Sequence, residues 1–210
     1  RTGSGKTGAF LLPILQRIDP SVRGCQAMIL VPTRELARQV VTAAELLFGP
    51  HGVEPTAVYG GVGYGPQFEA FERGAPLVVG TPGRILDHLL KRTLSLGKLQ
   101  MLVFDEADRM LSMGFYPDMQ RLKQFLPSHP LNGYMFSATF PAVVRSLAGE
   151  FLDNPEFLSL SRDKVHVAET EHVFYDVPAM DKDRMLMRII EVENPHSAIV
   201  FCNTKSDVRY

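Results

Sequence analysis

Cysteine is scarce in this sequence, with only Cys25 and Cys202 among 210 residues. The two lie far apart in the chain, and no histidine accompanies either of them at the spacing of a metal ligand. A disulfide framework and a zinc site are therefore both disfavoured. We expect two buried or inert thiols in a protein of a reducing compartment.

Long hydrophobic runs are also missing, because no apolar stretch approaches the roughly 20 residues that a membrane-spanning helix needs. The sequence begins at Arg1, and the segment after it is not the charged and then apolar stretch of a secretion signal. We expect a soluble protein without a membrane partner, located in the cytoplasm, or in the nucleus if the source is eukaryotic.

A third missing feature is an excess of charge of one sign, since 22 lysines and arginines face 23 aspartates and glutamates. The composition therefore does not indicate a polyanionic partner, and any nucleic-acid site must be formed locally by a few residues.

A length of 210 residues allows one substantial α/β domain and part of another.

What the sequence does contain is a series of short β-branched and apolar runs, each followed by a polar turn and an amphipathic stretch. The runs read AMILVPT, TAVYGG, PLVVGTPGR, MLVFDEAD and YMFSAT. This alternation predicts an α/β fold with a mostly parallel sheet and helices on both faces. Functional groups of such sheets gather beyond the carboxyl ends of the strands. Thr81 before Pro82, and Asp181, are predicted N-caps of helices.

The regular alternation of strand and helix lapses after residue 153. Residues 154–179 contain strand-like fragments without a long helix, as a domain boundary or linker does. One predicted helix and the strand-like run AIVFCNTK (198–205) follow. We predict a first domain over residues 1–153, a boundary region over 154–179 and the beginning of a second domain over 180–210.

The opening stretch RTGSGKT is typical of a loop that binds phosphates. Gly3 and Gly5 allow the backbone to approach a ligand closely, Lys6 is placed to reach the outer phosphates, and Thr7 to bind a magnesium ion. Taken alone, the stretch is also compatible with an ordinary glycine-rich turn.

A pair of acids supplies the complementary half of such a site. Asp105 follows the apolar run MLVF, where the second anchor of the metal belongs, and Glu106 is placed to orient or activate an attacking water. Alone, these acids are compatible with a charged helix start, since acids favour the helix N-terminus. The two stretches together, in this order, favour a nucleoside-triphosphate site.

A longer series of motifs resembles one family. The sequence contains TGSGKT, PTREL (32–36), GG (60–61), TPGR (81–84), DEAD (105–108) and SAT (137–139) in that order. This series resembles the motifs of the DEAD-box RNA helicases. The resemblance implies a RecA-like P-loop domain that lacks its first strand, followed by the start of a second RecA-like domain at AIVFCNTK.

The resemblance assigns roles to individual residues. ATP and Mg²⁺ are the implied cofactors, and Lys6, Asp105 and Glu106 are the implied catalytic residues. The implied nucleotide-binding residues are Thr2, Gly3, Ser4, Gly5, Lys6 and Thr7, with Thr7 and Asp105 also binding the metal. The implied RNA-binding residues are Thr33, Arg34, Gly60, Gly61, Thr81, Gly83 and Arg84. Asp108, Ser137 and Thr139 are implied to couple the ATP site to RNA strand separation.

Some of these roles have simpler alternatives. Thr139, which stands before Phe140 and Pro141, could merely cap a helix, and Arg34 and Arg84 could be solvated residues at helix starts. If they contact RNA, the contacts involve helix N-termini and glycine N–H groups, which bind phosphates without reading bases. We therefore expect sequence-tolerant RNA binding by a monomer. The sequence does not indicate any protein partner.

The resemblance also implies that parts of the family's enzyme lie outside these residues. They include the first strand, the adenine-recognising segment and the arginine-bearing motif of the second domain. We expect the 210 residues alone to hydrolyse ATP at or near background, to unwind nothing and to be prone to aggregation. We also expect either a vacant slot beside MLVFD and YMFSA, or the segment AIVFC filling it.

Two other classes of function remain open from the sequence. One is a nucleotide-gated RNA clamp that does not unwind, although the presence of both Lys6 and Glu106 favours an enzyme. The other is a DNA-directed motor with the same ATPase core, which differs in whether it recognises the 2′-hydroxyl of RNA.

Overall fold

The computed structural model describes residues 5–159, 171, 173–178, 181–202 and 204. By its internal contacts the chain divides into two units, residues 1–157 and residues 158–210. The first unit contains the sheet, and the second contains helix α8 (Lys182–Glu193). The three-part division of the chain stays a prediction; its first boundary, after residue 153, lies close to the division between the two units.

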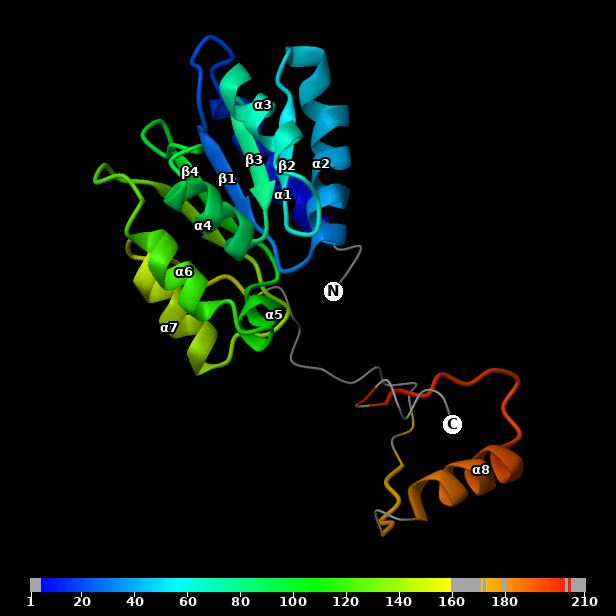
Figure 1. Ribbon diagram of the computed structural model, residues 1–210. Coiled ribbons are helices and arrows are strands. Elements are labelled where there is room, and N and C mark those ends of the chain that lie inside the picture. The colour runs from blue at the N-terminus through cyan, green and yellow to red at the C-terminus, as the bar shows by residue number, and fades with distance from the viewer. Residues whose placement is uncertain (1–4, 160–170, 172, 179–180, 203, 205–210) are drawn as a thin grey trace. The chain divides into compact units, whose positions relative to one another are not determined.

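Five parallel strands form a single sheet in the first unit (Figure 1). They are β1 (Ala27–Leu30), β2 (Pro55–Val58), β3 (Leu77–Gly80), β4 (Met101–Phe104) and β5 (Asn132–Met135). Their order is β2-β3-β1-β4-β5, and in the central register Ala27 pairs with Leu77 on one side and with Met101 on the other. Each strand overlaps one of the apolar runs, so the predicted α/β fold is confirmed.

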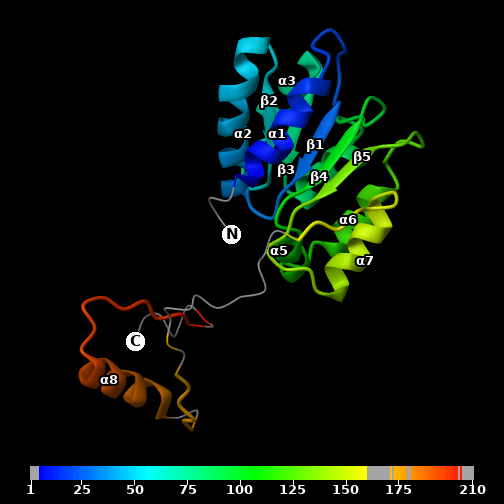
Figure 2. The ribbon, with the colours of Figure 1, turned by 180° about the vertical axis from the view of Figure 1, so that it is seen from behind.

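One face of this sheet is covered by α1 (Lys6–Arg17) and α2 (Arg34–Phe48), which lie in front of the strands in Figure 2. Side chains alternate along a strand, so Ala27 and Ile29 of β1 point to this face. They pack against Phe10 and Ile14 of α1 and Val40 of α2, all of which are buried. The apolar spacing of three and four residues on both helices explains this packing.

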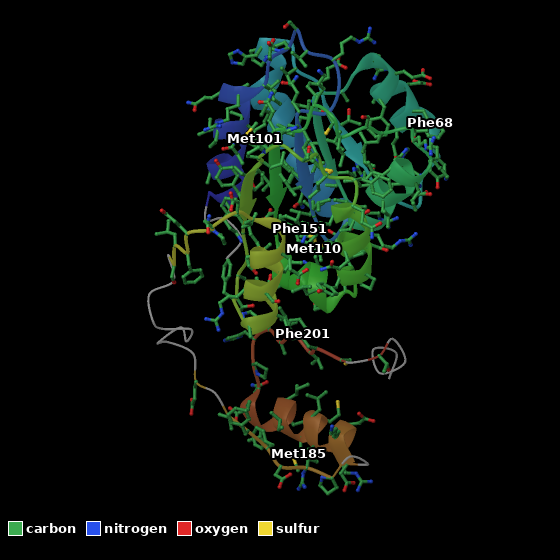
Figure 3. All side chains as sticks on the ribbon, turned by 90° about the vertical axis from the view of Figure 1, so that its left-hand side faces the viewer. Phe68, Met101, Met110, Phe151, Met185 and Phe201 are labelled. Carbon is green, nitrogen blue, oxygen red and sulfur yellow. The ribbon has the colours of Figure 1, made fainter. Side chains whose placement is uncertain are left out.

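The opposite face is covered by several shorter helices. These are α4 (Pro82–Leu90), α5 (Ala107–Ser112), α6 (Tyr116–Lys123) and α7 (Ala142–Phe151), with α3 (Gly65–Arg73) and the 3₁₀ turn η1 (Gly49–His51) completing the unit. Met28 and Leu30 of β1 point to this face and belong to its core. Met110 of α5 and Phe151 of α7, both labelled in Figure 3, contribute to the same core.

Strand β5 forms one edge of the sheet. Asn132 is exposed and the rest of β5 is partly exposed, whereas β1, β3 and β4 are buried throughout. The prediction of a vacant slot beside MLVFD is wrong, because β4 pairs with β1 and β5 on its two sides. Within the described residues, no strand pairs with the outer edge of β5.

The described segment AIVFC (198–202) does not pair with any strand of the sheet. Residues 198–202 form no strand, so the prediction of a strand there is wrong for these described residues. A strand is stabilised by hydrogen bonds to a neighbour, and the described residues of the second unit offer none.

Two predicted helix starts are confirmed in position. Thr81 is the N-cap of α4, with Pro82 in its first turn, and Asp181 is the N-cap of α8. Neither side chain makes a capping hydrogen bond.

Both cysteines are free. Cys25 is buried, and burial raises the pKa of its thiol to about 12, whereas Cys202 is exposed. In the part of the chain that the structure describes, no helix has both the length and the apolar character to cross a membrane.

Candidate nucleotide site and nucleic-acid interface

The first helix begins in the motif that predicts phosphate binding. Gly5 is the N-cap of α1 with a φ of 76°, a left-handed conformation that glycine adopts without strain. Lys6 and Thr7 are the first two residues of the helix. No side chain caps this N-terminus, so its N–H groups suit an anion. Thr2, Gly3 and Ser4 lie outside the described residues.

A tight turn after β4 positions the two acids. Asp105 follows the strand, donates its backbone N–H to Leu30 at 2.9 Å and is only 4% exposed. Its Oδ1 accepts the backbone N–H of Glu106 at 3.0 Å. Glu106 has a φ of 54°, a left-handed conformation that costs a residue with a side chain about 1 kcal/mol. This turn directs the chain from β4 straight into α5.

Lys6 and Glu106 line the same open cavity of about 930 Å³, together with Asp108 and Thr139. The Lys6 ammonium also acts on Asp105. Burial raises the pKa of the Asp105 carboxyl, and the positive charge of Lys6 partly offsets this rise. The structure thus brings the lysine and both neighbouring acids to one site.

Asp108 connects this cavity to the loop that follows β5. Its Oδ2 accepts the backbone N–H and the hydroxyl of Thr139, at 3.0 and 2.8 Å, and its backbone N–H donates to the Ser137 hydroxyl at 3.1 Å. Burial alone raises the pKa of Asp108, but these hydrogen bonds outweigh it and leave the pKa below its ordinary value. The alternative of Thr139 as a helix cap is wrong, because Pro141 is the N-cap of α7.

The residues that could hold a divalent cation are few. Within the described residues, no three histidine, cysteine, aspartate or glutamate side chains gather into a metal site. Asp105 and the hydroxyl of Thr7 suit Mg²⁺, which takes one or two protein oxygens and completes its shell with water and phosphate. The chemistry of this donor set therefore fits the ion.

The segments predicted to contact RNA follow three adjacent strands. The loop after β2 contains Gly60 and Gly61, and the loop after β1 ends at Thr33. Thr81 directly follows β3, and Gly83 lies in the first turn of α4. Because the strands are parallel neighbours, these loops meet at one edge of the sheet. Thr33 caps α2, since its hydroxyl accepts the Leu36 N–H at 3.2 Å. Two helix N-termini and a glycine turn therefore share this edge.

The two arginines of these segments differ in their surroundings. Arg34 is exposed and forms an ion pair of 2.6 Å with Glu35. Its Nη1 lies 3.5 Å from the place that a Cβ on Gly61 would take. Arg84 turns toward the preceding loop, where its Nη2 donates to the carbonyl of Val62 at 2.6 Å.

Sequence reasoning missed several residues around these sites. Arg109 forms an ion pair of 3.3 Å with Glu106, at a spacing of three residues in DEADR. Tyr64 and Asp87 form a hydrogen bond between the GG loop and α4. The signal for Asp87 was its position three residues after Arg84 and four before Lys91, which places three charged residues on one helix face.

Comparisons with known proteins agree with this geometry. A model of the family described as DEAD/DEAH box helicase matches residues 1–147. The ATP-dependent RNA helicase DeaD of Haemophilus influenzae is 41% identical over 207 residues, which are 98% of this chain and 34% of that protein. The ATP-dependent RNA helicase CshA of Listeria monocytogenes is 39% identical, over 99% of this chain and 40% of that protein.

Solved structures give the same result. A DEAD box protein of the hyperthermophile Methanococcus jannaschii superposes with a TM-score of 0.73 at 35% identity, over 100% of this chain and 55% of that one. Dbp5 of S. cerevisiae, solved with ADP and partner proteins, superposes with a TM-score of 0.65 at 34% identity, over 74% of this chain and 40% of that one. The chain spans about a third of the length of the DeaD relatives it matches. By sequence and by fold, the chain belongs to the DEAD/DEAH box helicase family.

Proposed function

We propose that the protein containing this chain is an ATP-dependent RNA helicase, which couples ATP binding and hydrolysis to RNA binding and local duplex separation. The observation that carries the proposal is the shared cavity of Lys6 and Glu106, with Asp105 beside them and Asp108 bonded to Thr139. The names of the matched relatives support the same reaction. A monomer acting in the cytoplasm, with RNA as its partner, is part of the proposal.

Each residue of the site has a role in this mechanism. Lys6 and the N-terminus of α1 hold the negative charge of the phosphates. Thr7 and Asp105 would hold Mg²⁺, which neutralises charge on the phosphate oxygens when it is bound. Glu106 orients or activates the attacking water as a general base. Residues 2–5 complete the phosphate loop in the proposal.

The RNA part of the proposal uses the adjoining loops. Thr33, Arg34, Gly60, Gly61, Thr81, Gly83 and Arg84 form the interface. Their N–H groups and charges suit a sugar-phosphate backbone, so binding should be tolerant of sequence and weaken as salt rises. Ser137, Thr139 and Asp108 couple the two sites, because their hydrogen bonds tie α5 to the loop after β5.

The proposal is tested by RNA-stimulated phosphate release from the full-length protein. Lys6→Ala should abolish nucleotide-dependent activity, and Glu106→Gln should lower kcat by at least about 100-fold while ATP binding persists. Lys98→Ala and Glu45→Gln are matched controls at exposed positions outside the site and should behave like the wild type.

Two outcomes would favour the rival functions. If Glu106→Gln leaves ATP-dependent retention of RNA unchanged, instead of trapping the RNA, the protein is a clamp that does not need hydrolysis. If a DNA strand competes as well as an RNA strand of the same sequence, the protein is not selective for the 2′-hydroxyl and the RNA assignment fails.

A further inference from the structure

A cluster of charged and aromatic side chains joins the GG loop to helix α4. Tyr64 is the last residue of that loop and the N-cap of α3. Its hydroxyl donates a hydrogen bond to Oδ2 of Asp87, which lies in the middle of α4. A loop that follows β2 is thereby fastened to the helix that follows β3.

The ring of Tyr64 is in contact with two cations, Arg84 of α4 and Lys91, the C-cap of that helix. The guanidinium carbon of Arg84 lies 4.0 Å from the ring centroid, and the ammonium of Lys91 lies 3.8 Å from it. Lys91 is itself paired with Asp87 at 3.2 Å. One phenol therefore holds three charged side chains at fixed places along one face of α4.

The arginine in this cluster provides a second link between the two segments. Nη2 of Arg84 donates to the carbonyl of Val62 at 2.6 Å, while its Nη1 is buried and has no hydrogen-bond partner among the described residues. The ring of Phe68, a residue of α3, stacks on the ring of Tyr64, with the two ring centroids 5.5 Å apart. Without the Tyr64 ring, the Arg84 guanidinium would keep only one of its two contacts with the GG loop, the hydrogen bond to the Val62 carbonyl.

We propose that Tyr64, fastened by Asp87, is a positioning residue that sets the GG loop against the N-terminus of α4, so that both segments engage one RNA backbone together. The inference rests on the proposed function, since it concerns RNA binding at the same interface. Tyr64 acts through the loop and through Arg84. Neither Tyr64 nor Asp87 belongs to the cavity that contains Lys6 and Glu106.

The test measures RNA affinity and nucleotide affinity separately in the full-length protein. Fluorescence anisotropy gives the Kd for a labelled single-stranded oligouridylate, and a fluorescent ATP analogue reports on the nucleotide site. Tyr64→Ala should raise the Kd for RNA about tenfold. Tyr64→Phe, which keeps the ring and loses the hydroxyl, should raise it by about threefold. The nucleotide Kd should stay the same in both variants.

The variants at Asp87 provide the conservative comparison. Asp87→Asn keeps an oxygen that accepts from Tyr64 and should bind RNA nearly as the wild type does, whereas Asp87→Ala should resemble Tyr64→Phe. Leu94→Ala removes a buried side chain of the core into which α4 packs, and Leu94 is not a member of the charged and aromatic cluster. Its unfolding temperature should fall while its RNA affinity persists, which separates positioning from a general loss of stability.

The possible failures are distinct. If the wild-type protein does not bind the RNA, the proposed function fails, and the inference fails with it. If the wild type binds RNA and Tyr64→Ala binds equally well, the proposed function stands and the positioning role is overturned. A loss of RNA affinity in Leu94→Ala that equals the loss in Tyr64→Ala would also overturn the role, because stability alone would then explain both.

Discussion

Outside the nucleotide site, the histidine His88 has a strongly shifted pKa. It is fully buried between α3 and α4, with Nε2 2.8 Å from Oε1 of Gln67 and Nδ1 2.8 Å from the Thr93 hydroxyl. Nε2–H of the neutral ring can donate to the amide oxygen of Gln67, and burial favours this neutral form. Burial lowers the pKa of His88 from 6.5 to about 4; the charges of Arg84 and Lys91 also lower it, and Asp87 opposes them.

This pKa shift predicts a loss of stability in mild acid. Below pH 6.5 the unfolded chain binds a proton at His88, whereas the folded chain does not until about pH 4. The contribution of His88 is therefore fully present above pH 6.5 and is lost as the pH falls toward 4. Between about pH 7.5 and about pH 5, urea denaturation should show a decrease of up to about 2 kcal/mol in the free energy of unfolding.

Two histidine variants separate this effect from general acid sensitivity. His88→Gln should have a lower free energy of unfolding than the wild type at neutral pH. Between about pH 7.5 and about pH 5, its free energy of unfolding should decrease much less than that of the wild type. His51→Gln changes an exposed histidine and should retain the wild-type decrease. An unchanged pH profile in His88→Gln would show that other groups cause it.

At the scale of the elements, the close approach of β2 and β3 depends on Gly80. A Cβ on Gly80 would lie 2.1 Å from the carbonyl oxygen of Val58, which accepts the Thr81 N–H at 3.0 Å. Gly80→Ala should therefore displace the backbone that precedes α4 and lower the free energy of unfolding by about 3 kcal/mol. Chemical denaturation of the purified variant measures this loss.

Gly133 of β5 is the matched control for this substitution. A Cβ there would lie 2.4 Å from Cδ2 of Leu152, the end of a flexible side chain that can move away. Gly133→Ala should lower the free energy of unfolding by about 1 kcal/mol or less, because the alanine also restricts the unfolded chain. Equal losses in the two variants would contradict the argument that a rigid carbonyl makes Gly80 necessary.

The sequence was most informative about the strands and helices. The strands β1, β3 and β4 lie wholly within apolar runs, because a strand buried between two layers of helices must be apolar along its whole length. The edge strands β2 and β5 are partly exposed and overlap their runs only in part. The run AIVFC has the same composition but forms no strand in the described residues. Composition makes a strand possible, and a neighbour to pair with is also required.

The candidate sites were predictable to a different degree. Motif order, through its resemblance to one family, was enough to predict that Lys6, Asp105 and Glu106 would meet. The bond between Tyr64 and Asp87 was not predictable, because it joins residues 23 positions apart whose distance depends on the packing of α3 and α4. Long-range contacts of side chains are the part of a site that a sequence does not specify locally.

For the whole molecule, the position at which the folded unit ends can be tested. Every residue of the two described cores lies at or before Phe151, and the first unit extends to Phe157. Phe157 packs edge to face on Phe140, with ring centroids 5.1 Å apart. The described part of the second unit contributes no buried residue, since even α8 has none. Stability should therefore depend on where the chain is cut relative to Phe157.

We expect a chain that ends at Phe157 to unfold in urea with the same midpoint as the 210-residue chain, because it keeps both cores and the Phe140 contact. A chain that ends at Asp153, the boundary predicted from the sequence, loses the contact and should be less stable by about 0.5–1.5 kcal/mol. Replacing Phe157 with Ala in the longer chain should reproduce that loss, which assigns it to the ring. If the cut after Phe157 lowers the midpoint as much as the cut after Asp153, residues beyond 157 stabilise the first unit, and the division into two units is wrong.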